Sequence, residues 1–142
     1  MRTLASSFAD PKDVEAFKAC VARGNSQRWC LRKGDNGVGC WGDDTAQTKT
    51  PMCALPPDDM IQRWGSVEER RLKKIPKTAA HRRVVVVVRE RFVVCILADR
   101  MPWRKNIRNG AGIDLNPAAA KALGLEPPFL VPASWTWEDD VT

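Results

Sequence analysis

Two valine-rich runs dominate the hydrophobic pattern in the middle of the chain. They cover residues 83–89 and 92–98 and are separated by Glu90, which predicts two adjacent strands joined by a tight turn. Because the apolar residues are continuous, we expect these strands to be covered on both faces or closed into a barrel. Weaker strand patterns lie around Cys40 and Trp41, from Leu72 to Ile75 and from Phe129 to Trp137. Prolines in and before the last one indicate an edge strand or a strongly bent strand.

Three short helices are predicted between these strands, at about residues 11–22, 57–64 and 117–123. The first has Asp10 as a cap, Pro11 at the first helical position and Gly24 as a stop, a combination typical of helix ends. Short strands with small helices in a chain of 142 residues indicate a compact, mainly β barrel decorated by helices.

Length and composition exclude several classes of protein. A mass of 15.9 kDa, 44% hydrophobic and 28% charged residues fit one folded domain and exclude global disorder. The longest apolar runs, residues 84–88 and 92–98, are far short of a membrane span. The first ten residues lack the apolar centre of a signal peptide. We therefore expect synthesis in the cytoplasm, so that action at the cell envelope or in a phage particle needs another exit route.

Five cysteines at wide spacings argue against a disulfide framework and favour buried thiols in a reducing compartment. The chain has no CxxC pair and a single histidine, His81, so we expect neither a metal site nor a cofactor. A Cys/His nucleophilic pair remains an open alternative, and it would have to use His81.

Charge is unevenly distributed along the chain. Residues 63–91, the basic band, contain ten basic and three acidic residues, whereas residues 126–142 contain four acids and no base. A basic band attracts polyanions, but the solvated faces of strands and loops are the favoured explanation. No nucleic-acid-binding motif accompanies it, so the sequence argues against a nucleic-acid partner.

The most specific feature is a pair of segments, Val93–Pro102 and Gly112–Gly124. They resemble the second half of the double-psi β-barrel domain of rare lipoprotein A, in which Asp-Arg-Gly-Pro precedes Ile-Asp-Leu-Ser and an Ala-rich helix ending in Leu-Gly. Expansins, family 45 endoglucanases and the lytic transglycosylase MltA share this barrel. The resemblance implies a six-stranded double-psi β-barrel over residues 37–142, preceded by a helix and turn-rich extension over residues 1–36.

The chain departs from the family pattern at two places. Met101 stands where the family has the glycine of Asp-Arg-Gly-Pro. No histidine precedes Leu55–Pro56, where the family places one, and His81 lies in another segment. These departures concern activity more than the barrel.

The resemblance implies cleavage of a glycosidic bond, which needs an acid to protonate the leaving oxygen. Asp99 ends an apolar strand, so burial is expected to raise its pKa and suit it to acid catalysis. Asp114 is the second candidate catalytic residue. The alternatives stay open: Asp99 caps a turn or pairs with Arg100 or Arg104, and Asp114 forms structural hydrogen bonds.

Six further residues are candidates for substrate binding. They are polar or aromatic side chains near the two aspartates in the resemblance: Trp41, Asp43, Asp44, Thr45, Arg100 and Trp103. Indole rings stack well on the apolar face of a sugar, whereas residues 43–45 also fit an ordinary Asx turn. Trp135 and Trp137 alternate along a strand, which favours the core for both.

We therefore expect a protein that cleaves or binds a cell-wall polysaccharide, with peptidoglycan glycan strands as its partner and an aspartate as general acid/base. The alternative is a non-catalytic structural or adaptor barrel with protein partners, for example in a phage particle or a secretion apparatus. Nucleic-acid binding, the third class, rests on charge alone.

Overall fold

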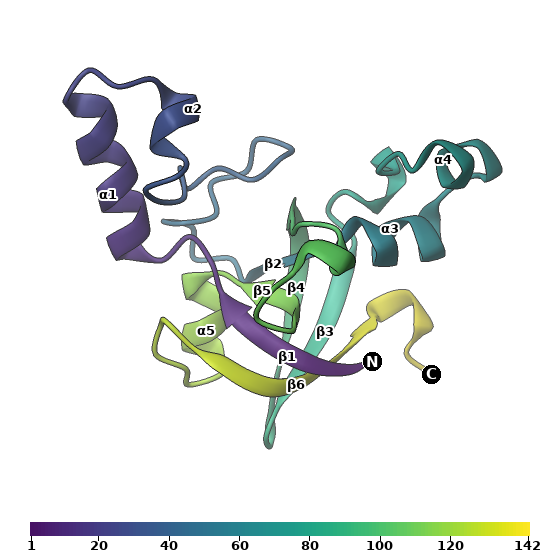
Figure 1. Ribbon diagram of the computed structural model, residues 1–142. Coiled ribbons are helices and arrows are strands. Elements are labelled where there is room, and N and C mark those ends of the chain that lie inside the picture. Colours follow the sequence, from purple (N-terminus) through teal and green to yellow (C-terminus); the bar gives the residue numbers. More distant parts are fainter.

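The computed structural model describes residues 1–142, and six strands form a closed barrel in the order β1-β5-β2-β4-β3-β6 (Figure 1). The strands are β1 (Arg2–Ser7), β2 (Met52–Leu55), β3 (Arg83–Val88), β4 (Arg91–Arg100), β5 (Ala111–Leu115) and β6 (Leu130–Trp137). The prediction of a mainly β barrel with decorating helices is confirmed.

The pairing of the strands has an internal twofold pattern. β1 runs parallel to β5 and β2 runs parallel to β4, while every other neighbouring pair is antiparallel. Exchanging β1 with β4, β2 with β5 and β3 with β6 leaves this set of pairs unchanged. The topology is therefore compatible with the predicted double-psi barrel.

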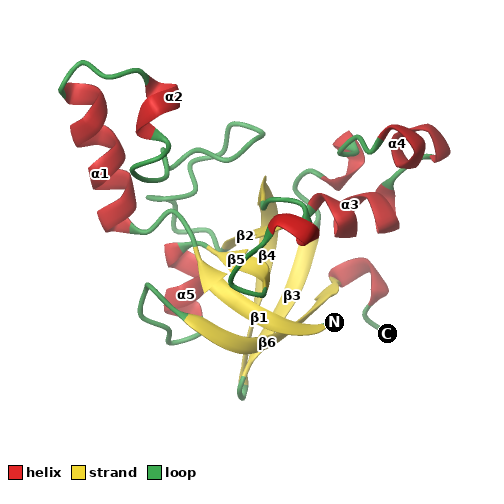
Figure 2. Ribbon diagram, viewed as in Figure 1, coloured by secondary structure: helices red, strands yellow, loops and turns green.

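Five helices lie outside the barrel (Figure 2). They are α1 (Pro11–Ala22), α2 (Gln27–Cys30), α3 (Pro57–Trp64), α4 (Val67–Leu72) and α5 (Pro117–Ala122). The views place α1 with α2 and α3 with α4 as two arms on opposite sides of the same end of the barrel. The three predicted helices correspond to α1, α3 and α5. No helix has the length and apolar character required to cross a membrane.

A cluster of 20 buried residues fills the barrel interior and continues under α5. Along β3 the valines alternate, with Val84, Val86 and Val88 buried and Val87 exposed. Closure of the barrel, rather than layers on both faces, therefore explains the valine run. Trp135 and Trp137 lie in the core as predicted, with ring centroids 5.4 Å apart.

Two predicted strands are wrong. The segment from Leu72 to Ile75 is the end of α4 and the coil after it, because a capping box of Ser66 and Glu69 starts the helix and Lys73 ends it in a left-handed conformation. The residues around Cys40 form a turn, in which only Val38 and Asp44 make an isolated bridge.

The predicted domain division at residue 37 is also wrong. β1 lies between β5 and β6, so residues 2–7 belong to the barrel rather than to an extension. Within β1, only Ala5 and Ser6 are buried, and this short, mixed segment carries no hydrophobic run. Its place is set by pairing with two strands more than 100 residues away in sequence.

Pro132 does not mark an edge strand, because the closed barrel has none. It pairs with Leu4 of β1, in the half of β6 beyond its contact with β3. A strand with only one partner at that position loses little from a missing N–H donor.

Two of the cysteines differ from the expectation that most of them are buried free thiols. Cys20 of α1 and Cys30 of α2 form a disulfide with Cα atoms 5.6 Å apart. Together with Phe17 and Val21 they make a small core separate from the barrel. Cys40, Cys53 and Cys95 remain free, and the last two are buried as expected.

The acidic C-terminal segment lies against part of the basic band. Three ion pairs join them, Arg63–Asp140 at 2.9 Å, Arg82–Asp139 at 3.3 Å and Arg83–Glu138 at 3.2 Å. Two charge features that look independent in sequence therefore neutralise each other in the fold.

Candidate functional site

A row of four residues crosses the barrel wall and contains both candidate catalytic aspartates. Ser6 of β1 pairs with Asp114 of β5, and Asp114 pairs with Ala54 of β2. On its other side Ala54 pairs with Asp99 of β4. The two aspartates thus flank the same residue, with their backbones two strand spacings, or about 10 Å, apart.

This row faces away from the barrel interior. The neighbours of Ala54 and Asp114 along their strands, Cys53, Leu55, Ile113 and Leu115, all lie in the core. Since side chains alternate along a strand, Ala54 and Asp114 face outward. A register shift in β4 after Leu97 pairs Asp99 with Ala54, so its carboxyl group lies on the same outer face. There Ala54 packs against Met101 and Ala111, with Phe8 and Ile107 beside them.

Asp99 is held by the loop that precedes β2. Its carboxylate accepts hydrogen bonds from the backbone N–H of Cys40 at 3.0 Å and of Arg100 at 2.8 Å. The loop lies close because Gly39 packs on β4, where a Cβ atom would come within 2.0 Å of the Ala98 carbonyl oxygen. Burial raises the pKa of Asp99 despite these donors, so the predicted direction is confirmed.

Asp114 is more strongly perturbed. Burial raises its pKa to about 7, the negative charges of Asp99 and Asp10 add to this, and a hydrogen bond from the Ser6 hydroxyl opposes it. A carboxyl group with a pKa near 7 retains its proton at neutral pH often enough to act as a general acid. The cause is burial, as in other carboxyl groups that serve as acids.

The two carboxyl groups open into adjoining hollows rather than one cleft. Asp99 lines a hollow with residues 31–40 of the preceding loop, and Asp114 lines another with Ser7 and residues 106–109. Asp13 and Pro102 border both hollows. The two hollows therefore meet along these two residues without merging into one groove.

The surroundings of Asp114 are acidic. Asp10 and Asp13 line the same hollow, and burial raises the pKa of Asp10, whose Oδ1 atom has no hydrogen-bond partner. The negative charge of Asp35 also reaches both Asp99 and Asp114. No three of the acidic, cysteine or histidine side chains are grouped as a set of metal ligands.

Two of the predicted substrate-binding residues have structural positions. The Asp44 carboxylate accepts hydrogen bonds from the N–H groups of Ala46 and Gln47, which is an Asx turn. Thr45 is fully buried, and its carbonyl oxygen accepts a hydrogen bond from Asn116. In this arrangement Thr45 has no surface to offer a substrate.

A contact that the sequence did not reveal joins Asp43 to His81. The imidazole Nε2 lies 2.8 Å from the Asp43 carboxylate, and the ring meets Trp41 edge-on with centroids 6.1 Å apart. Trp41 and Asp43 are on the same turn as Cys40, whose backbone N–H donates to Asp99. A separation of 38 residues between Asp43 and His81 gives no local signal for this pairing.

The remaining aromatic and basic candidates are dispersed. Arg100 is exposed at the end of β4, and its own backbone N–H donates to the Asp99 carboxylate. Trp103 lines a different hollow, next to α3. The face of Trp64 is covered by the guanidinium groups of Arg63 and Arg82, at 4.0 and 3.7 Å from its centroid.

Cys40 lies near this site without the properties of a nucleophile. Burial, and next the charge of Asp99, raise the pKa of its thiol to about 11. A thiolate is the reactive form of cysteine, so the thiol at this position is not activated. The raised pKa argues against Cys40 as the nucleophile of the Cys/His alternative, and the other free cysteines, Cys53 and Cys95, are buried.

The chain matches no protein-family model and no curated protein sequence. The link to rare lipoprotein A therefore depends on the motif order in the sequence together with the barrel topology.

Proposed function

We propose that this protein cleaves or binds a cell-wall polysaccharide, with the glycan strands of peptidoglycan as the substrate and a barrel similar to that of rare lipoprotein A. The observation that carries the proposal is the pairing of Asp99 and Asp114 on either side of Ala54. It puts two carboxyl groups of raised pKa on one outer face of the barrel.

The proposed reaction is a lytic transglycosylation, which needs a single acid/base. Protonated Asp114 donates its proton to the glycosidic oxygen as the bond from that oxygen to the anomeric carbon breaks. A hydroxyl group of the same sugar attacks the anomeric carbon and closes a 1,6-anhydro ring. Its proton passes to the Asp114 carboxylate, which restores the acid.

Asp99 has a different role in this scheme. Backbone N–H groups of Cys40 and Arg100 donate to its carboxylate, and such donors favour the ionised form. An ionised Asp99 stabilises the positive charge that develops at the anomeric carbon. Two nearby carboxyl groups with different protonation provide the division of roles that glycosidases use.

The disulfide supports a site of action outside the cytoplasm. Disulfides such as Cys20–Cys30 form and persist in oxidising compartments and on particle surfaces. Action at the cell envelope or within a phage particle, the localisation proposed here, is consistent with such a bond.

The second candidate function is a non-catalytic structural or adaptor barrel. It is favoured by one observation, namely that Asp99 and Asp114 line separate hollows on either side of Pro102. Under this alternative the two aspartates would contact a partner protein separately and would not act on one glycosidic bond.

Incubation of the protein with purified peptidoglycan distinguishes these functions through the appearance of 1,6-anhydro muropeptides. We expect release by the wild type and loss of at least about a hundredfold in Asp114→Asn, the scale of general acid catalysis. Asp99→Asn should also lose activity. Asp44→Asn is the matched control, because an amide oxygen can accept the same two backbone hydrogen bonds in the Asx turn.

Absence of anhydro products from folded wild-type protein would leave the adaptor function. Products whose yield is unchanged in both Asp99→Asn and Asp114→Asn would remove the site assignment while keeping the activity.

A further inference from the structure

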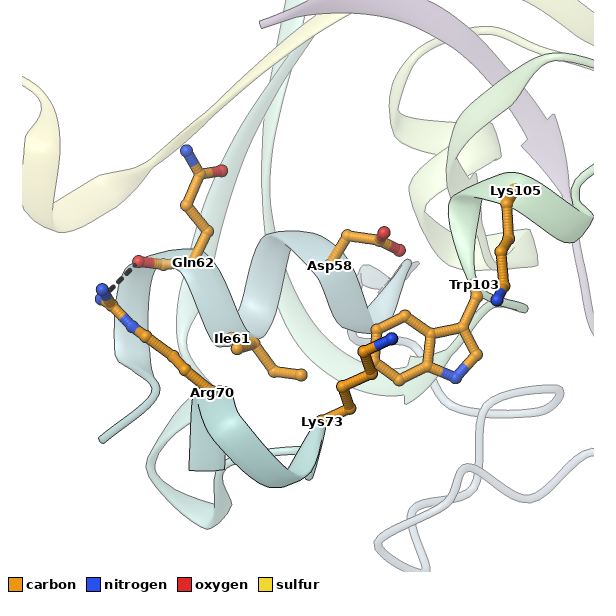
Figure 3. Close-up of a pocket in the computed structure, with 7 residues that line it drawn as sticks. All are labelled: Asp58, Ile61, Gln62, Arg70, Lys73, Trp103 and Lys105. Carbon is orange, nitrogen blue, oxygen red and sulfur yellow. Dashed lines mark hydrogen bonds between the residues drawn. The ribbon is translucent and has the colours of Figure 1, made fainter. Parts of the chain in front are cut away.

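A third hollow, of about 720 Å³, lies between α3, the C-terminal end of α4 and the β4–β5 loop (Figure 3). We call it the basic hollow, because its lining includes three cationic side chains. It is lined by Asp58, Ile61, Gln62, Arg70, Lys73, Trp103 and Lys105. These residues come from α3, from α4 and its C-terminal end, and from the β4–β5 loop (Figure 3).

The loop wall of the basic hollow is fixed to α3. The Asp58 carboxylate accepts a hydrogen bond from the Arg104 N–H at 2.9 Å, and buried Asp59 pairs with the Arg104 guanidinium at 2.6 Å. Asp59 is only 2% exposed, so its ion pair with Arg104 is largely desolvated on the carboxylate side. Trp103 and Lys105 flank Arg104 and are thereby held at the hollow before any ligand arrives.

The cations of the basic hollow have no carboxylate partner. Arg70 donates to the carbonyl oxygen of Gln62 at 2.9 Å, and neither Lys73 nor Lys105 takes part in an ion pair. Elsewhere in the basic band, Arg63, Arg82 and Arg83 are paired with the C-terminal acids. Asp58 is the one carboxylate in the lining, so the hollow keeps a net positive charge.

Lys73 occupies a backbone position that favours glycine or asparagine. It ends α4 with φ of 53° in the left-handed region, a conformation that is strained for a lysine because of its Cβ atom. Figure 3 shows its side chain extending from the end of α4 toward the Trp103 ring. Strained residues of this kind concentrate at binding sites.

We propose that the basic hollow binds a sugar residue that bears a carboxylate or a phosphate. The cations attract the acidic group, and the indole of Trp103 offers an apolar face for the sugar ring. Trp103 follows Asp99 by four residues, a span of at most about 14 Å. One polysaccharide can therefore place a neutral sugar at the aspartates and an acidic sugar in the basic hollow. The choice of a sugar as the ligand rests on the proposed function.

Binding of three monosaccharides tests the inference without requiring cleavage. N-acetylmuramic acid carries a carboxylate, N-acetylglucosamine 6-phosphate carries a phosphate, and N-acetylglucosamine is the neutral match. The readout is the NMR shift of the Trp103 indole N–H, assigned through Trp103→Phe. We expect an acidic sugar to bind at least about tenfold more tightly than the neutral one, a difference that a charge-assisted hydrogen bond supplies.

Lys73→Ala and Lys105→Ala should each weaken binding of the acidic sugar by about tenfold. Lys74→Ala is the matched control, because Lys74 is an exposed neighbour outside the hollow. Comparison of N-acetylmuramic acid with N-acetylglucosamine 6-phosphate shows whether the hollow prefers a carboxylate or a phosphate.

Equal binding of neutral and acidic sugars, or acidic binding that survives both lysine substitutions, would overturn the inference. Anhydro products together with such a result would leave the proposed function standing. Acidic binding without any anhydro product would keep the basic hollow and reject catalysis.

Discussion

The protonation of Asp114 links the stability of the fold to the chemistry proposed for it. Its folded pKa of about 7 lies above the ordinary value of 3.8 because the group is buried. The folded protein therefore holds this proton at pH values where the unfolded chain has released it. Stability from this group is complete at acidic pH and falls as the pH rises from about 4 to 7.

Asp114→Asn should remove this dependence. At pH 8 we expect the variant to exceed the wild type in free energy of unfolding by about 4 kcal/mol, the energy that separates pKa values of 3.8 and about 7, and at pH 4 the two should be similar. Urea denaturation at both pH values measures the difference. Glu15→Gln, an exposed change on α1, should leave it unaltered, and a gain for Asp114→Asn that does not vary with pH would contradict the assignment.

The same titration predicts the pH profile of glycan cleavage. Because the proposed acid must be protonated, kcat/KM should fall with rising pH about a midpoint near 7. The negative charge of Asp99 contributes to the raised pKa of Asp114. In Asp99→Asn the midpoint of the remaining activity should therefore move to a lower pH. An unchanged midpoint in that variant would mean that another group carries the proton.

At the scale of elements, the α1–α2 hairpin is a small unit with its own covalent bond. Its core consists of Phe17, Cys20 and Cys30 with Val21 packed alongside. So few apolar side chains bury little surface, which leaves the pair of helices dependent on the disulfide. Asp13 of α1 borders both aspartate hollows, so the position of this hairpin bears directly on the site.

Replacing Cys20 and Cys30 by serine should lower the free energy of unfolding by about 2–3 kcal/mol, the loop-closure value for a separation of 10 residues. Thermal unfolding followed by circular dichroism measures this loss. Cys40→Ser, at an exposed free thiol, should change stability little. Thiol titration of the denatured wild type should find three free thiols, and five would show that the disulfide does not form.

At the scale of the whole molecule, closure of the barrel depends on its first strand. β1 fills the position between β5 and β6, and without it both strands would present an unpaired edge. Open sheet edges in a small barrel lead to aggregation. At the other end of the chain, three ion pairs hold the acidic C-terminal turn against the basic band.

A chain of residues 37–142 should therefore fail to fold, although the sequence alone suggests it as a complete domain. We expect poor amide dispersion in its NMR spectrum and aggregation, while residues 1–142 give a dispersed spectrum. A soluble 37–142 fragment with native-like dispersion would show that β1 is dispensable for the barrel.

The sequence by itself determined the elements whose signals are local. The helices at 11–22 and 57–64, each with a proline in its first turn, and the valine strands depend on residues within one turn or one strand of each other. The motif order also singled out Asp99 and Asp114, two of the four residues in the row that crosses β1, β5, β2 and β4. Strand ends and helix caps have a fixed order along the chain, so the sequence contains this signal. Local propensity and spacing were sufficient for these features.

Only the tertiary structure decided which distant segments meet. β1 has almost no hydrophobic pattern and acquires its role by pairing with β5 and β6. The Asp43–His81 contact, the Cys20–Cys30 bond and the basic hollow join residues whose spacing carries no signal. Barrel closure brings β1 against β5 and β6, and burial in the folded structure, which no local pattern encodes, sets the pKa of Asp114.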